Sequence, residues 1–282
     1  MPPITRGAYG FRLNYADPGE HLDDLVHLGD SEPEVTVSWR HASTLADVEE
    51  VDEERVVYGI RGATTFRVER DPASIVIDVP FPPVPGALVH PLLTIAISIL
   101  ARWRGDVTLH AGAFETPAGA WGVMGVREAG KSAMLAAVSR RGLPIVADDL
   151  LTIEDGSVWA GPDCVDLRPD TAERFGARYL GIVGGRPRFR LSTPPSRPRV
   201  PFRGFFILDW HDRPEIEAEP LPTRERLRWL YRQEYIPLVG FSDPRELLSL
   251  LPAPAWRLSR PQDWTATETT VDRVLEVVEE AS

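Results

Sequence analysis

The sequence has little of several things that define other classes of protein. It contains one cysteine among 282 residues, Cys164, so no disulfide can form within the chain, as expected of a reduced cytoplasmic protein. The longest apolar run, 92–101, has about ten residues, which is too few to span a bilayer. The first six residues lack the apolar core of a signal peptide. We therefore expect a cytoplasmic protein that does not enter a membrane.

Positively charged residues are outnumbered, with 31 lysines and arginines against 42 aspartates and glutamates. The formal net charge of −11 argues against binding of nucleic acid through a general basic surface, although it leaves room for a local basic pocket. An apolar content of 43% and eight tryptophans indicate a globular protein rather than a disordered one. The length suits one large domain or two modest ones.

An octapeptide at residues 125–132 fits the phosphate-binding loop pattern GxxxxGK[ST]. An apolar run, 120–124, precedes it and a helix-like stretch, 132–141, follows it, which is the strand–loop–helix setting that the motif requires. In such loops main-chain N–H groups surround phosphate oxygens at a helix N-terminus. The expected nucleotide-binding residues are Gly125, Val126, Arg127, Glu128, Ala129, Gly130, Lys131 and Ser132.

The last two residues of this loop predict the ligands. Lys131 is expected to reach the β- and γ-phosphates, and Ser132 is expected to ligate Mg²⁺. We therefore expect ATP and Mg²⁺ as cofactors, with GTP and pyrophosphate open as other phosphate donors.

Two aspartates and a histidine near the loop suggest chemistry. Asp148 and Asp149 end the apolar strand that follows the loop helix, where open α/β sheets place their ligand groups. Adjacent residues at a strand end point to different sides, so one carboxylate could hold Mg²⁺ while the other accepts a proton from an attacking hydroxyl. A turn or helix cap is the structural alternative for the pair. His110 lies on the expected strand 107–114, and a hydrogen-bonded core histidine is its alternative role.

The chain is expected to have two parts. Residues 1–86 are rich in alternating, strand-like segments such as 35–39, and they end in a proline-rich linker at 80–86. Residues 87–282 carry the loop, a buried helix at 91–104, a strand at 205–210 and three closing helices at 224–235, 244–251 and 271–280.

The order of these motifs resembles a known family. His110, the loop at 125–132 and the pair Asp148 and Asp149 follow one another with spacing similar to that in the kinase domain of HPr kinase/phosphorylase. They are still more similar to HPr-kinase-like proteins that accompany ribosomally made peptides, including lasso-peptide kinases. The match covers residues 105–152.

The resemblance implies a fold and roles for residues. The implied fold is an α/β P-loop kinase core of the HPr kinase and phosphoenolpyruvate carboxykinase type, here with a β-rich N-terminal region. By the resemblance, Lys131 and Ser132 bind phosphates and metal, and one aspartate acts as base on a serine hydroxyl with His110 nearby. We favour Asp149 as the base and Asp148, with Ser132, as the metal ligand, and the reverse assignment stays open.

Some residues depart from the family pattern. The loop carries Arg127 and Glu128 where the family has small residues, and a carboxylate facing a triphosphate would weaken binding. We therefore expect Glu128 to point away from the phosphates and to pair with Arg127 or another arginine, such as Arg197. Three arginines at a proline-rich segment are candidates to hold phosphate or an acidic substrate, with solvated surface positions as the equal alternative. They are Arg197, Arg199 and Arg203.

Together these features predict an ATP- and Mg²⁺-dependent kinase. Its expected acceptor is a hydroxyl, in serine or threonine of a peptide or protein substrate. A small-molecule alcohol such as a sugar or amino acid is the second candidate acceptor. A nucleotide-binding accessory protein without turnover is the third hypothesis, which Glu128 favours. The N-terminal part is expected to serve substrate docking or homo-oligomer formation.

Overall fold

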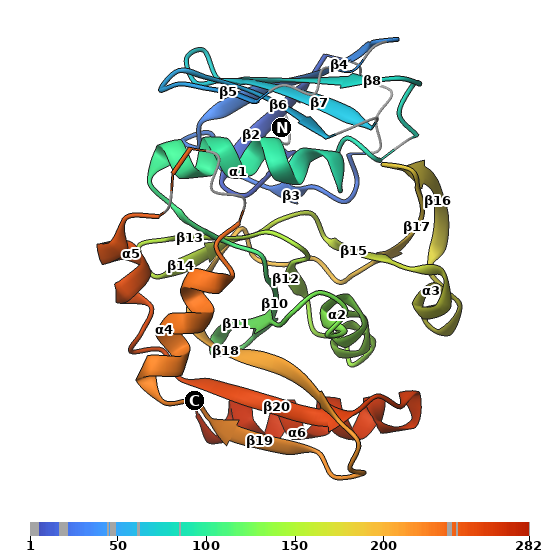
Figure 1. Ribbon diagram of the computed structural model, residues 1–282, viewed down its shortest axis with the longest axis vertical. Coiled ribbons are helices and arrows are strands. Elements are labelled where there is room, and N and C mark those ends of the chain that lie inside the picture. Colours follow the sequence, from blue (N-terminus) through green and yellow to red (C-terminus); the bar gives the residue numbers. More distant parts are fainter. Residues whose placement is uncertain are drawn as a thin grey trace.

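A computed structural model gives the fold of the chain (Figure 1). It describes residues 6–16, 22–43, 45, 49–60, 63–84, 86–235, 239–240 and 242–281. Residues 1–5, where we expect no signal peptide, and residue 85 of the expected linker lie outside the described residues. The described chain is a mixed α/β structure with several sheets, as the sequence predicts.

The N-terminal region forms an eight-stranded sheet with the order β3-β1-β2-β4-β8-β7-β6-β5. The alternation expected at 35–39 is present, since Val35 and Val37 are fully buried while Glu34 and Thr36, which alternate with them, are exposed. One face of the sheet therefore packs into a core. The strands are β1 (Arg6–Ala8), β2 (Phe11–Tyr15), β3 (Val26–His27), β4 (Glu34–His41), β5 (Glu49–Val51), β6 (Arg55–Ile60), β7 (Thr64–Glu69) and β8 (Ser74–Val79).

Helix α1 (Leu92–Arg104) covers that buried face. Its apolar residues Leu93 and Ile97 are fully buried, and each such side chain contributes roughly 1.5–3 kcal/mol relative to an exposed one. The helix ends at Gly105, whose φ of 107° is one that glycine adopts without a Cβ penalty. It contacts β7 above and the second sheet below, as Figure 1 shows. The first helix after the expected linker thus shares the core of the N-terminal region.

The second sheet has nine strands, and the loop at residues 125–130 follows one of them. Its main order is β12-β10-β11-β18-β14-β13-β9, and β20 pairs with β18 and β19. The strands are β9 (Val107–Leu109), β10 (Gly112–Thr116), β11 (Gly119–Met124), β12 (Ile145–Ala147), β13 (Leu151–Glu154), β14 (Ser157–Trp159), β18 (Arg199–His211), β19 (Glu217–Pro220) and β20 (Ala255–Pro261).

Helices bury both faces of this sheet near β11 and β18. Alternate residues of β11 face two different cores: Met124 packs with residues of α4 and α5, and Val123 packs with residues of α2, α3 and α6. Burial on both faces explains why these strands read as continuous apolar runs. The helices are α2 (Lys131–Arg140), α3 (Pro169–Phe175), α4 (Thr223–Arg232), α5 (Pro244–Ser249) and α6 (Thr267–Glu280).

A small three-stranded sheet lies beside α2 and α3 (Figure 1). Its order is β15-β17-β16, and the strands are β15 (Cys164–Leu167), β16 (Arg178–Val183) and β17 (Arg186–Ser192). Within the described residues, none of the helices has the length and apolar character needed to cross a membrane.

Two expectations about strands need correction. The single strand expected at 107–114 is two strands, β9 and β10, because the chain leaves the sheet at His110, whose N–H donates to the carbonyl of Gln233. Strand β18 begins at residue 199 rather than 205, so it takes in part of the segment expected to be a surface loop. Pairing of Arg199 with Trp159 of β14 stabilises this extension.

The direction of the strands brings the motifs to one edge. Strand β10 is antiparallel to both β11 and β12, and β11, β18 and β20 are mutually parallel. The loop after β11, Asp148 after β12 and the ends of β18 and β20 therefore meet at the same edge. His110 reaches that edge as well, because β10 begins there with Gly112 opposite Val123.

Candidate active site

The octapeptide 125–132 forms a loop between β11 and α2. Gly130 has a φ of 84°, and a Cβ there would lie 2.9 Å from the guanidinium of Arg260, so the position demands glycine. Helix α2 begins at Lys131 without a side-chain cap. Its first N–H groups are therefore left to bind an anion at the positive end of the helix.

Lys131 and Ser132 begin this helix and face the aspartates. The Lys131 ammonium donates to the carbonyl of Gly125 at 3.1 Å, so the side chain folds back over the loop. Burial lowers the pKa of Lys131, and Asp149 and Asp148 oppose that shift. The Ser132 hydroxyl donates to Oδ1 of Asp148 at 3.0 Å.

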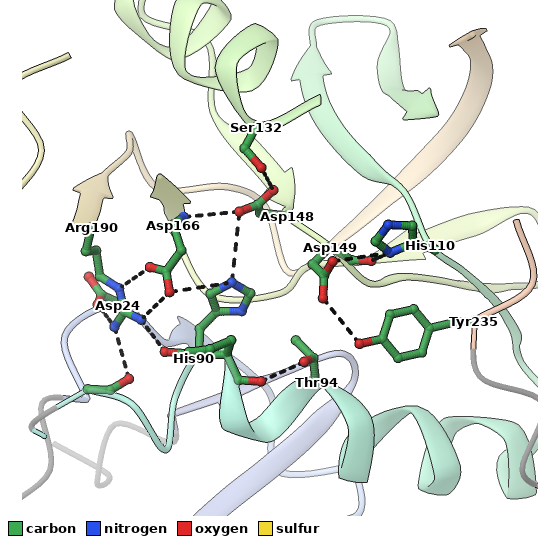
Figure 2. Close-up of polar contacts among 12 residues, drawn as sticks. Asp24, His90, Thr94, His110, Ser132, Asp148, Asp149, Asp166, Arg190 and Tyr235 are labelled. Carbon is green, nitrogen blue, oxygen red and sulfur yellow. Dashed lines mark hydrogen bonds and ion pairs between the residues drawn. The ribbon is translucent and has the colours of Figure 1, made fainter. Parts of the chain in front are cut away.

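Asp148 is buried, with 6% of its surface exposed. Its Oδ2 accepts the backbone N–H of Asp166 at 3.1 Å (Figure 2). Burial raises the pKa of Asp148 to about 6; His90 opposes the shift, and the carboxylates of Asp149 and Asp166 add to it. The environment of Asp148 therefore disfavours the ionised form of its carboxyl group.

A buried cluster of charged residues lies behind Asp148. His90 Nε2 is 3.9 Å from Oδ2 of Asp148 and 4.0 Å from Oδ2 of Asp166. Arg190 pairs with Asp166 through Nε at 3.0 Å and with Asp24 through Nη1 at 3.1 Å, and it also donates to the carbonyl of His90. Burial alone would lower the pKa of Arg190, but Cys164, Asp166 and Asp24 outweigh it and raise that pKa.

Sequence reasoning missed this cluster. Only two features of the sequence indicate it. Asp166 is a charged residue inside the apolar strand β15, and Arg190 is one of the arginines at every second position of β17. Both residues have side chains only 1% exposed. A charge in an apolar strand indicates a buried ion pair, but nothing local identifies its partner.

Asp149 has a different environment from its neighbour. Its φ of 74° turns the chain, and its side chain faces the cavity with 38% of its surface exposed. Oδ1 lies 3.2 Å from Nδ1 of His110, and Oδ2 accepts the hydroxyl of Tyr235 at 3.2 Å (Figure 2). Burial tends to raise the pKa of Asp149, but the hydrogen bond and charge of His110, with help from His90 and Tyr235, lower it to about 2.

A cavity of about 1120 Å³ opens along the loop. That volume is slightly above the range of typical small-molecule sites, roughly 300–1,000 Å³. Asp148 and Ala129 are not among the residues that line it. The expected site residues that line it are His110, Gly125, Val126, Arg127, Glu128, Gly130, Lys131, Ser132 and Asp149.

Two residues that sequence reasoning missed hold the loop from the neighbouring strands. Arg260, at the end of β20, donates to the carbonyl of Ala129 at 2.6 Å. Trp210, at the end of β18, donates to the carbonyl of Glu128 at 3.2 Å. The guanidinium of Arg260 lies 3.9 Å from the centre of the Trp210 ring, and burial lowers the pKa of Arg260 to about 10.

Glu128 pairs with an arginine, as expected, but not with either of the two arginines named as candidates. Glu128 pairs with Arg168 at 3.0 Å, not with Arg127 or Arg197, and its side chain is 63% exposed. The hydrogen bond from Arg168 is the main cause that lowers the pKa of Glu128. Arg168 starts the turn into α3, which lies next to the loop only in the folded chain. Arg197 instead forms an ion pair with Glu115.

The three arginines proposed to hold phosphate are outside the cavity. None of them is among the described residues that line it. Arg199 pairs with Glu154 at 3.4 Å, and Arg203 donates to the carbonyl of Ala118. The alternative interpretation, that these arginines are surface residues, therefore fits better than a role at this cavity.

Ser132 and Asp148 form a small set of oxygens suited to Mg²⁺. Within the described chain, no three His, Cys, Asp or Glu side chains group in a way that could hold a metal ion. Mg²⁺ typically needs only one or two protein ligands, because phosphates and waters supply the rest. Adjacent ligands of an octahedral ion at about 2.1 Å lie about 3 Å apart. The 3.0 Å between Ser132 Oγ and Asp148 Oδ1 fits that spacing.

The two aspartates should affect stability in opposite directions. The unfolded pKa of an aspartate is about 3.9, so a folded pKa of about 6 makes ionised Asp148 destabilising above pH 6. Asp148→Asn should raise the free energy of unfolding at pH 7.5 by up to about 3 kcal/mol. That gain should vanish below about pH 4. Chemical unfolding without Mg²⁺ or nucleotide measures it.

Asp149→Asn is the matched comparison. The folded pKa of about 2 is below the unfolded value, so ionised Asp149 stabilises the fold above about pH 4, and this stability is lost as the pH falls toward 2. Asp149→Asn should therefore lower the Tm at pH 7.5. Equal shifts of the same sign in both variants would contradict the two environments.

Glu128→Gly should leave nucleotide affinity within a few-fold of wild type. The carboxylate is occupied by Arg168 at the rim, and glycine suits the φ of 68° at this position. Calorimetric titration with MgATP measures the affinity, with Arg168→Ala as the control for loss of the ion pair alone. A large gain in affinity in Glu128→Gly would mean that the natural loop is impaired.

Comparison with known proteins adds little. No protein-family model matches the sequence, and no curated protein matches it. Among solved structures, the chain is similar to the structure of the Hpr(Ser) kinase/phosphatase from Coxiella burnetii, with 14% identity over 61% of this chain and 98% of that one. The TM-score is 0.29, so the likeness is weak and carries no weight for function.

Proposed function

We propose that the protein is an ATP- and Mg²⁺-dependent kinase that phosphorylates a hydroxyl group, in serine or threonine of a peptide or protein. The observation that carries this proposal is the placement of Asp149. It is a carboxylate with a pKa of about 2, held by His110 and Tyr235, that faces the same cavity as the phosphate-binding loop. Phosphoryl transfer uses a carboxylate in this place to orient the acceptor hydroxyl.

The residues divide the work of phosphoryl transfer. The acceptor oxygen would attack the γ-phosphorus and the bond to the β-phosphate oxygen would break, releasing ADP, while Asp149 takes the hydroxyl proton. A carboxylate of low pKa is a weak base. In a loose transition state, however, orientation of the hydroxyl matters more than its early deprotonation. Lys131 and the N–H groups of the loop would offset the phosphate charge.

Asp148 would have a separate role with Ser132. Their oxygens would hold Mg²⁺, which would supply positive charge to offset the negative charge that develops during transfer. The arrangement of Asp166 and His90 behind Asp148 supports this role, because it fixes the side chain without closing off Oδ1. We also propose that the N-terminal region docks substrate or forms a homo-oligomer.

A small-molecule alcohol is the second candidate acceptor, and the cavity volume is compatible with it. The accessory-protein hypothesis loses its main support, because Glu128 is paired with Arg168 at the rim.

Nucleotide binding is tested with Lys131→Ala. A ligand that binds only the folded state raises its Tm, so MgATP should stabilise the wild type. Lys131→Ala should lose that stabilisation, because its ammonium is the main positive charge expected to reach the phosphates. Thermal melting with and without MgATP measures the effect. Unchanged stabilisation in the variant would exclude the loop as the nucleotide site.

Turnover is tested with Asp149→Asn. Removal of a general base should lower kcat by roughly 10²–10⁴-fold while leaving nucleotide affinity near wild type. Transfer of labelled γ-phosphate to a panel of serine and threonine peptides measures it, with free sugars and amino acids as rival acceptors. Wild-type rates in both Asp149→Asn and Asp148→Asn would assign the aspartates a structural role and favour the accessory protein.

A further inference from the structure

Trp264 is an exposed aromatic residue that the proposed chemistry does not use. It begins the short 3-10 turn η1 (Trp264–Ala266), lines the cavity and has 37% of its surface exposed. A tryptophan with so much open surface in a cavity is available to a flat ligand.

Two neighbouring residues of α3 contact the ring of Trp264. The guanidinium of Arg174 lies 4.8 Å from its centre, and the ring of Phe175 meets it at 6.4 Å and 62°. Asp263, which precedes it, accepts the N–H of Thr265 at 2.9 Å and so fixes the turn. The indole is therefore oriented before any ligand binds, which reduces the entropy lost on stacking.

The position of Trp264 relative to the loop follows from β20. Arg260, near the end of that strand, donates to the carbonyl of Ala129 in the loop. Trp264 lies four residues further on, so it is within about 14 Å of Arg260 even if the chain is fully extended. That distance is within reach of the nucleoside of a nucleotide whose phosphates occupy the loop.

The strands that lead to Trp264 and to the proposed base, β20 and β12, lie on opposite sides of β11. Residues Phe205–Ile207 of β18 pair with β11 on one side and with β20 on the other. Strand β12, which leads to Asp149, lies on the far side of β11, beyond β10. In-line transfer requires the acceptor and the leaving nucleotide on opposite sides of the γ-phosphate. The acceptor side is that of Asp149, which leaves the side of Trp264 for the nucleoside.

We propose that Trp264 is the stacking platform for the nucleobase of the phosphate donor. This inference rests on the proposed function, and it makes the donor a nucleoside triphosphate rather than an inorganic polyphosphate. Stacking of a base on an aromatic side chain is sequence-tolerant, so the platform alone accepts both adenine and guanine.

The test compares two ligands that share phosphates but not a base. Titration calorimetry on the full chain gives the Kd of MgATP and of magnesium tripolyphosphate for wild type, Trp264→Ala, Trp264→Phe and Phe81→Ala. Phe81 is the control because it is 76% exposed and does not line the cavity. Trp264→Ala should weaken MgATP binding by about 5- to 150-fold and leave tripolyphosphate unchanged.

The other variants complete the comparison. Trp264→Phe should recover most of the MgATP affinity, and Phe81→Ala should match wild type for both ligands. The tripolyphosphate affinity also reports that the loop of each variant is folded. Equal loss for both ligands in Trp264→Ala, or no loss for either, would overturn the inference.

The same titrations distinguish a failure of the proposed function from a failure of the nucleobase platform. If wild type binds neither ligand, the loop is not a phosphate site, and the kinase proposal falls together with the platform. If wild type binds both ligands equally tightly, the loop holds phosphates but the nucleobase platform is refuted.

Discussion

The ion pair between Asp166 and Arg190 is the interaction on which the site depends. Asp148 and Asp166 place two carboxylates in the interior, and uncompensated buried charges are strongly destabilising. Arg190 compensates Asp166 and also contacts Asp24 and the carbonyl of Gly86, so it ties the N-terminal region to β15 and β17. The backbone N–H of the same Asp166 positions Asp148. Arg190 thus joins the two parts of the chain beside the candidate active site.

Adjacent aspartates acquire opposite properties because the backbone turns between them. The positive φ of Asp149 directs its carboxylate to the cavity, where His110 and Tyr235 favour the charge, while Asp148 stays in the buried cluster. Tyr235 lies just beyond α4, and its side chain is part of the core that α1 shares with the N-terminal sheet. Both carboxylates are therefore held in part by groups that come from outside the strand–loop–helix unit.

Local patterns made the centre of this arrangement predictable. The glycine spacing, the apolar strand before the loop and the aspartates after β12 are all encoded within a short stretch of sequence. The residues that pair with the site residues are not encoded locally. Asp24 and Arg190 are 166 residues apart, and Arg168 reaches Glu128 only because α3 folds beside the loop. The break at His110 was also missed, because the apolar run continues through it while a carbonyl from Gln233 captures its N–H. Short-range periodicity cannot report contacts of that kind.

Lys131 is also distinctive for its residue type. It is the only lysine in the chain, because the other residues counted as lysine or arginine are all arginines. Its ammonium folds over the loop at Gly125, and burial lowers its pKa, which increases the share of reactive neutral amine. An amine-selective acylating reagent therefore has one side-chain target in the protein besides the terminal amine. The extent of labelling of Lys131 would therefore measure how much of the loop is occupied by a ligand. The measurement needs no mutation, and it can be made in a mixture of competing ligands.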